Sequence, residues 1–310
     1  MGHLVYKSRP FWIIYLILSL TQLLCAWDVS TEHTPGRLGV QLDFSLFHSW
    51  PPDNDGAETG GKAAGRKRSF VFSSRLKFKQ ATDVTHISDK QLTSLAIEAY
   101  KEMEALCGKT KYNIVSENMP SVMTAMAYDD EIILSSSQRG KTSFSYGDPD
   151  HPDSRPRANI VKQQLDLCQQ TFMHNAPEAD RTKDQHRHNG QCGEQLVAHA
   201  FYKIHPEPDA DLSKRNGRVT TVHKSGGKQA GRGVIAMDPC NTPNPDNAND
   251  DSASYWGCAE FVRRPEVGLR AFTLEIDENQ RGDEWMYDLS TLAGGLADGY
   301  PKKISLCQKD

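Results

Sequence analysis

The stretch CGEQLVAHAFYKI, residues 192–204, is the most helix-like segment in the middle of the chain. It opens with a cysteine and an acid two residues later, and two more cysteines follow. Cys240 stands in a Pro-Cys pair after the apolar run GVIAMD, and Cys258 lies in GCAEF. Three thiolates can hold a zinc ion and leave one coordination position for water, while a nearby acid moves a proton. The pattern predicts a Zn²⁺ site with Cys192, Cys240 and Cys258 as ligands and Glu194 as the catalytic residue that moves the proton.

The N-terminus has the composition of a secretory signal peptide. Lys7 and Arg9 precede FWIIYLILSLTQLLCA, residues 11–26, an uncharged run shorter than the ~20 residues of a membrane-spanning helix. We expect cleavage near Ala26, a secreted mature chain and no stable membrane association; an uncleaved signal anchor is the alternative. Losing residues 1–26 removes two cations and no acid, so the formal charge changes from −4 to −6. An acidic chain has no general attraction to nucleic acid.

Cysteine usage offers a second interpretation of the same residues. Seven cysteines become six after cleavage, and six cysteines in a secreted protein are typical of three disulfides. Cys107 and Cys168 lie on predicted neighbouring helices and could pair. Cys240 and Cys258 either bind zinc or form a disulfide that closes the segment between them.

The 310 residues are enough for one large domain or two small ones. We interpret residues 27–84 as a poorly structured leader or propeptide, rich in Gly, Pro, Asp and Thr and ending in a basic segment. The Lys67-Arg68 pair in that segment is a dibasic processing site, a phosphate-binding patch or an exposed loop. A single domain is expected over residues 85–310.

Periodicity within residues 85–310 predicts alternating helices and strands. The expected helices cover residues 88–108, 157–174, 192–204, 258–264 and 283–293, and the expected strands cover 121–128, 131–136, 232–238, 268–276 and 302–306. This order predicts an α/β fold, three-layer α/β/α, with a mixed sheet of about five strands.

Several of these features together resemble the cytidine deaminase-like superfamily, which includes secreted toxin and effector deaminases. A leading helix, the hairpin VMTAMAYDDEIILSSS, Cys-x-Glu at a helix start and a strand ending in Pro-Cys occur in that order. The similarity covers residues 85–275. It implies two neighbouring helix N-termini that carry the zinc-binding thiolates, with Glu194 as the proton shuttle. The implied reaction is hydrolytic removal of an amino group from a cytosine- or adenine-type base in a nucleobase, nucleoside or nucleic acid.

The chain departs from the family pattern between its last two predicted ligands. Seventeen residues, Asn241 to Gly257, lie between these two cysteines, whereas the usual motif has two residues between them. We expect this polar segment to be a surface flap, at whose end the aromatic residues Tyr255 and Trp256 either place a ring over a base or pack against the domain surface. The alternative to an enzyme is a non-enzymatic secreted effector or binding protein on a disulfide-stabilised scaffold of the same type.

Histidines near the triplet are rival ligands. His186 and His188 lie in the charged loop RTKDQHRHNGQ, where solvated side chains are expected. His199 lies on the predicted helix and is expected to be a packed or a surface residue.

Overall fold

The structure is a computed structural model that describes residues 29, 32–49, 69–82, 85–140, 143–146, 160–175, 186–226, 231–243, 255–276 and 281–307. The predicted signal peptide and the Lys67-Arg68 pair lie outside the described residues. None of the helices within these ranges is both long enough and apolar enough to cross a membrane.

The centre of the fold is a hairpin of two buried strands. β3 (Val122–Tyr128) and β4 (Glu131–Ser136) pair antiparallel around a turn at Asp129 and Asp130, which confirms the predicted hairpin. Asp129 takes the left-handed conformation, φ 42°, which short polar residues tolerate in such turns. The hairpin is buried along both faces, so each face needs its own cover of helices.

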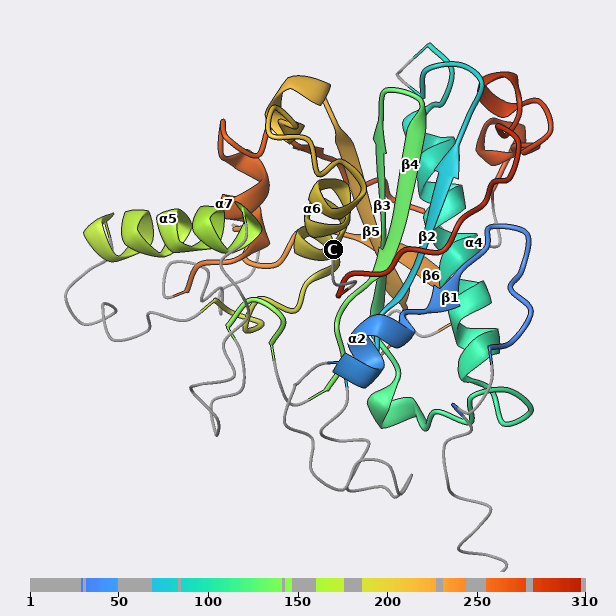
Figure 1. Cartoon of the computed structure of the whole chain (residues 1–310), viewed down its shortest axis with the longest axis horizontal. Helices are drawn as coiled ribbons and strands as arrows, with labels where there is room; N and C mark the ends of the chain where they lie inside the picture. Colours follow the sequence, from blue (N-terminus) through green and yellow to red (C-terminus); the bar gives the residue numbers. More distant parts are fainter. Residues whose placement is uncertain are drawn as a thin grey trace, which may run out of the picture.

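Alternation along β3 sends its side chains to two different cores. Met123 and Ala125 join one hydrophobic cluster together with the residues of helix α4 (Asp89–Cys107). Met126 and Tyr128 join the other, which contains helix α6 (Gly193–Ile204). Figure 1 shows α4 on one side of the sheet and α6 on the other, so the fold has helices on both faces.

Within the described ranges the sheet has seven strands, and the prediction of about five is too low. The further strands are β1 (Gln41–Leu42), β2 (Phe72–Lys77), β5 (Arg218–Lys224), β6 (Val234–Met237) and β7 (Arg270–Ala271). The order is β1-β2-β4-β3-β5-β6, and β7 pairs with β5. Only the β5–β7 pair is parallel among these strands, which makes the sheet mixed as predicted. The expected strand at 302–306 is reduced to a single bridge between Arg75 and Lys302.

Residues 27–84 contribute three of these elements. β1, the short helix α2 (Phe44–Ser49) and β2 all lie in the range for which the sequence indicated little structure. Two cations of the basic segment lie on β2: Arg75 and Lys77 both pair with the carboxylate of Glu131, which is only 1% exposed. Part of the basic character therefore serves to neutralise a buried acid of the neighbouring strand.

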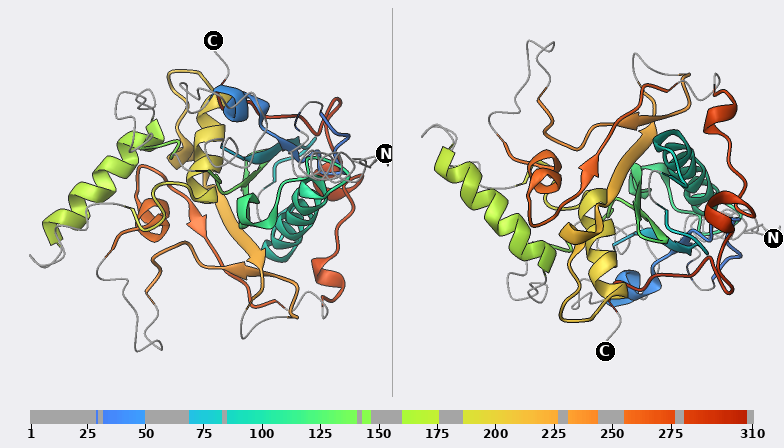
Figure 2. Two further views of the ribbon diagram at one scale, coloured as in Figure 1. Left: turned by 90° about the horizontal axis from the view of Figure 1, so that it is seen from below. Right: turned by 90° about the horizontal axis from the view of Figure 1, so that it is seen from above.

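Two further α-helices of the described residues contact α6. These are α5 (Ile160–Asn175) and α7 (Cys258–Arg263), and in both views of Figure 2 α5 is at the outer edge of the molecule. α4 begins with a capping box, in which the Ser88 side chain accepts from the Gln91 backbone N–H and the Gln91 side chain accepts from the Ser88 backbone N–H.

The edge of β5 opposite β3 is shared by two strands. β6 pairs with Thr221 to Lys224, and β7 pairs with Arg218 and Val219. The chain therefore leaves the sheet after β6 and returns to the same edge at β7, with α7 between them. This return brings the beginning of α7 next to the end of β6.

His199, on α6, is buried, and it packs edge-on against the Phe144 ring at 4.3 Å between centroids. Desolvation lowers its pKa from 6.5 to about 4, because burial opposes the charged imidazolium. The packed alternative for His199 is thereby confirmed.

We expect His199 to make the fold sensitive to mild acid. Between pH 6.5 and pH 4 the unfolded chain binds a proton that the folded chain excludes, so stability falls as pH falls through this window, by up to roughly 3 kcal/mol. Urea unfolding from pH 7 to pH 4 should show a weaker pH dependence in His199→Leu than in the wild type. Parallel pH profiles for the two proteins would contradict this role of His199.

Candidate metal centre

Cys192 is the N-cap residue of α6, immediately before the first helical residue. The predicted helix start at the Cys-Gly-Glu triplet is therefore confirmed. Gly193 is required there because a Cβ at this position would lie 2.1 Å from Thr124 Oγ1 and 2.9 Å from Thr124 Cβ. The glycine allows the beginning of α6 to rest directly on β3, which fixes the height of Cys192 and Glu194 above the sheet.

Cys240 and Cys258 are brought together by hydrogen bonds across the ends of the intervening segment. Asn241, in the left-handed region at φ 67°, donates from Nδ2 to the Tyr255 carbonyl at 2.7 Å and to Glu260 Oε1 at 3.2 Å. The backbone N–H of Cys258 donates to Cys240 Sγ at 3.1 Å. These hydrogen bonds join the two described ends of the segment and place Cys258, the first residue of α7, beside Cys240.

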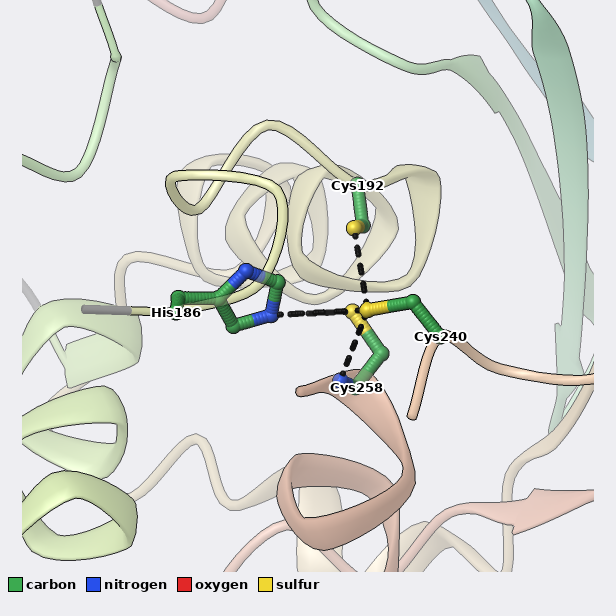
Figure 3. A group of neighbouring side chains, drawn as sticks. All are labelled: His186, Cys192, Cys240 and Cys258. Carbon is green, nitrogen blue, oxygen red and sulfur yellow. Dashed lines mark hydrogen bonds between the residues drawn. The ribbon is translucent and has the colours of Figure 1, made fainter. Parts of the chain in front are cut away.

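Four ligand atoms meet at this point, from His186, Cys192, Cys240 and Cys258, all within 4.8 Å of one another (Figure 3). Cys192 Sγ and Cys240 Sγ lie 3.5 Å apart. Sulfurs bound to one zinc ion at about 2.3 Å in tetrahedral geometry lie about 3.8 Å apart, whereas a disulfide requires about 2.05 Å. The spacing therefore fits a metal site and not a disulfide.

The disulfide predictions are wrong for the described cysteines, all six of which are free. Cys107 belongs to the hydrophobic cluster on the α4 side of the sheet, and Cys168 belongs to the cluster on the α6 side. Because the sheet separates them, they cannot pair. Cys240 and Cys258 are likewise free, and both belong to the group of four ligand atoms.

His186 was expected to be solvated, and this prediction is wrong: its exposed fraction is 3%. Its backbone forms a bridge to Trp256, and its ring meets the buried Trp256 ring edge-on at 5.0 Å. His186 Nε2 lies 3.6 Å from Cys258 Sγ and 3.7 Å from Cys240 Sγ. Nothing in the polar loop around His186 indicates burial; the partner that buries it is distant in sequence. His188 is exposed, as expected.

The pKa values of the three cysteines are shifted in different directions. Hydrogen bonds from the Cys192 and Cys258 side chains lower the pKa of Cys240. The hydrogen bond between Cys192 and Cys240 raises the pKa of Cys192, and burial raises the pKa of Cys258. Three thiolates in a space of this size repel one another and are desolvated. A divalent cation supplies the missing positive charge, so the donor set fits zinc.

Glu194, the second residue of α6, is 3% exposed. Its Oε1 accepts a hydrogen bond from Thr221 Oγ1 at 2.8 Å, and Thr221 Oγ1 lies 2.8 Å from Thr124 Oγ1. These two threonines are directly paired between β3 and β5. Desolvation, followed by the negative charge of Cys240, raises the pKa of Glu194. The carboxyl group is therefore held in a fixed orientation with an increased tendency to carry a proton.

A cavity of 470 Å³ opens onto the sulfurs and the carboxyl group. Cys192, Glu194 and Cys240 contribute to its wall, whereas His186 and Cys258 are not among its lining residues. Its polar lining also includes Ser137, Gln138, Arg139, His188, Thr221, His223, Lys224 and Asp238. The volume is in the range of about 300–1,000 Å³ that is usual for small-molecule sites.

A scan against protein-family models, a search of the curated proteins and a search of the solved structures each returned no match. The candidate metal centre is therefore defined by the residues and distances of this chain alone.

Because Gly193 contacts β3 so closely, we expect Gly193→Ala to displace the beginning of α6. The added methyl group overlaps Thr124, and overpacking of this kind destabilises folded proteins by about 1–3 kcal/mol. The matched control is Gly226→Ala, since a Cβ at exposed Gly226 meets nothing within 4 Å. Thermal or urea unfolding should separate the two variants, and metal binding should weaken only in Gly193→Ala. Equal stability of the two variants would contradict the close contact.

Proposed function

We propose that this chain is a zinc-dependent hydrolase that removes an amino group from a cytosine- or adenine-type base. The observation that carries the proposal is a buried carboxyl group, Glu194, beside converging sulfurs in the wall of a cavity. Acid, thiolates and open space are the parts that deaminases of the zinc type combine.

The ligands proposed for zinc are Cys192, Cys240 and Cys258. When bound, zinc would supply the Lewis acidity that makes water a usable nucleophile near neutral pH. Cys192 and Cys258 both lie where helices begin. The backbone N–H of Cys258, at the beginning of α7, donates to Cys240 Sγ at 3.1 Å and favours the thiolate of Cys240.

Glu194 is proposed to take a proton from the attacking water and to pass it to the leaving amine. Thr221 holds Oε1 through the 2.8 Å hydrogen bond, which fixes the carboxyl group beside the sulfurs. The raised pKa favours this role because a carboxyl group transfers protons best when its pKa is nearer to the working pH.

The substrate proposed for the cavity is a planar base, free, in a nucleoside or in nucleic acid. The exposed carboxylate of Asp238 is among the lining groups able to bond the edge of such a base. A signal peptide, secretion and an effector role remain part of the proposal, supported by the composition of residues 1–26.

A second candidate function is favoured by His186. Its Nε2 lies as close to two of the sulfurs as a fourth zinc ligand would lie, and a closed Cys₃His site has no position for water and is structural. The chain would then be a non-enzymatic secreted effector or binding protein stabilised by zinc.

We expect the purified protein to contain about one zinc ion per chain. Elemental analysis after dialysis should show that Cys258→Ser binds zinc at least about tenfold more weakly, because a ligand is lost. The control is Cys307→Ser, which changes a free cysteine outside the group of four ligand atoms and should retain the metal. A wild-type protein without zinc, with the three cysteines oxidised, would contradict the metal centre.

We expect Glu194→Gln to lower the rate of ammonia release by about 10²–10⁴-fold, because general acid–base catalysis contributes about that much. Zinc content should stay at the wild-type level, since Glu194 is not proposed as a ligand. Exposed Glu117→Gln is the charge-matched control. The assay follows ammonia from cytosine and adenine nucleosides and from single-stranded oligonucleotides. Full activity in Glu194→Gln would exclude Glu194 as the proton shuttle.

A further inference from the structure

The role of His186 decides whether the proposed zinc site is open or closed. A fourth protein ligand would complete the coordination of zinc, whereas three ligands leave a position for water. Distance alone does not separate these cases, because Nε2 lies 3.6 Å from Cys258 Sγ and 3.7 Å from Cys240 Sγ. The position of the ring proton separates them, since a nitrogen that carries a proton has no lone pair for a metal.

The Nδ1 atom of His186 is occupied as a hydrogen-bond acceptor. The backbone N–H of His188 points at Nδ1 at 3.0 Å, and the backbone N–H of Gly190 points at it at 3.2 Å. Backbone amides can only donate. Nδ1 therefore carries no proton, and a neutral imidazole must carry its single proton on Nε2, the atom that faces the sulfurs.

This arrangement is the reverse of the one found in metal-bound histidines. Such histidines donate a hydrogen bond from the ring nitrogen that does not bind the metal, to a carboxylate, a carbonyl oxygen or water. In His186 the corresponding nitrogen accepts two hydrogen bonds instead. The surrounding backbone thus selects the tautomer that cannot bind a metal through Nε2.

The buried side chain of Gln195 supports the same proton position. Its Nε2 lies 2.9 Å from His186 Nε2, while its Oε1 is buried with no hydrogen-bond partner among the described residues. A half-turn of the amide exchanges the two atoms and sets Oε1 opposite the His186 Nε2–H. The turn pairs the buried oxygen with the His186 Nε2–H and gives up the 3.5 Å hydrogen bond from Gln195 Nε2 to Cys258 Sγ.

The cavity lies on a different side of the cluster from His186. Its wall includes Cys192, Cys240 and Glu194, and His186 is not among its lining residues. His186 instead packs against buried Trp256. A ligand entering from the cavity therefore approaches the sulfurs next to Glu194 and away from the imidazole.

We propose that His186 is not a zinc ligand: its Nε2–H is bonded to the Gln195 amide and lies beside the sulfurs of Cys240 and Cys258, which leaves the fourth coordination position open on the cavity side. This inference rests on the proposed function, because it concerns the same metal centre. His186 is a positioning residue: its N–H, together with the backbone N–H of Cys258 at 3.1 Å from Cys240 Sγ, offsets the negative charge of three thiolates.

The test replaces zinc with Co²⁺ in the full chain and compares the wild type with His186→Gln, His186→Ala and Cys258→Ser. Glutamine retains an N–H donor near the position of Nε2 and cannot replace an imidazole as a strong zinc ligand. Metal affinity is measured by competition with a chelator. Access to the fourth position is measured from the visible Co²⁺ spectrum with and without azide.

The expected result is that His186→Gln binds Co²⁺ within about tenfold of the wild type and His186→Ala binds it about 10–100-fold more weakly, as for residues that support metal ligands. Cys258→Ser should lose far more affinity, and azide should shift the spectrum of the wild type. Loss of metal in His186→Gln to the same degree as in Cys258→Ser, or a wild-type spectrum indifferent to azide, would overturn the inference.

These outcomes separate the inference from the proposed function. A wild-type protein that binds no metal overturns both. A protein with an azide-sensitive metal centre and a tolerated His186→Gln substitution, but without ammonia release from any base tested, supports the inference and overturns the deaminase proposal.

Discussion

Three buried sulfurs within reach of one ion form the interaction on which the rest of this structure depends. Hydrogen bonds lower the pKa of Cys240 but raise that of Cys192, and burial raises that of Cys258. Without a cation the cluster therefore favours a single thiolate, whereas a divalent ion stabilises all three. The rigid β3–α6 contact at Gly193 and the hydrogen bonds of Asn241 hold the sulfurs at this spacing in advance.

The topology of the sheet explains how a long interruption between two ligands is tolerated. β6 and β7 share one edge of β5, so the chain leaves and returns at nearly the same place. The ends of the segment are tied by Asn241, and its length has little effect on the site, because the free energy of loop closure grows slowly with loop length.

The sequence predicts those parts of the fold that depend on local patterns. The hairpin of β3 and β4, helix α4 with its Ser88 cap and the helix start at Cys192 follow from periodicity and capping. β2 was missed because Arg75 and Lys77 make it look like a basic loop, although both pair with Glu131 across the sheet. His186 was missed for the same kind of reason, since the Trp256 that covers it lies far away in sequence. Both features depend on contacts between residues far apart in the sequence, which local sequence patterns do not reveal.

X-ray absorption at the zinc edge of the freshly purified protein reports the metal's neighbours. We expect three sulfur neighbours at about 2.3 Å and one lighter atom, without the outer-shell scattering of a bound imidazole. Absence of zinc, or a zinc ion with fewer than three sulfur neighbours, would contradict the claim that Cys192, Cys240 and Cys258 form one metal centre. Three sulfurs together with a bound imidazole would contradict the open position beside Glu194.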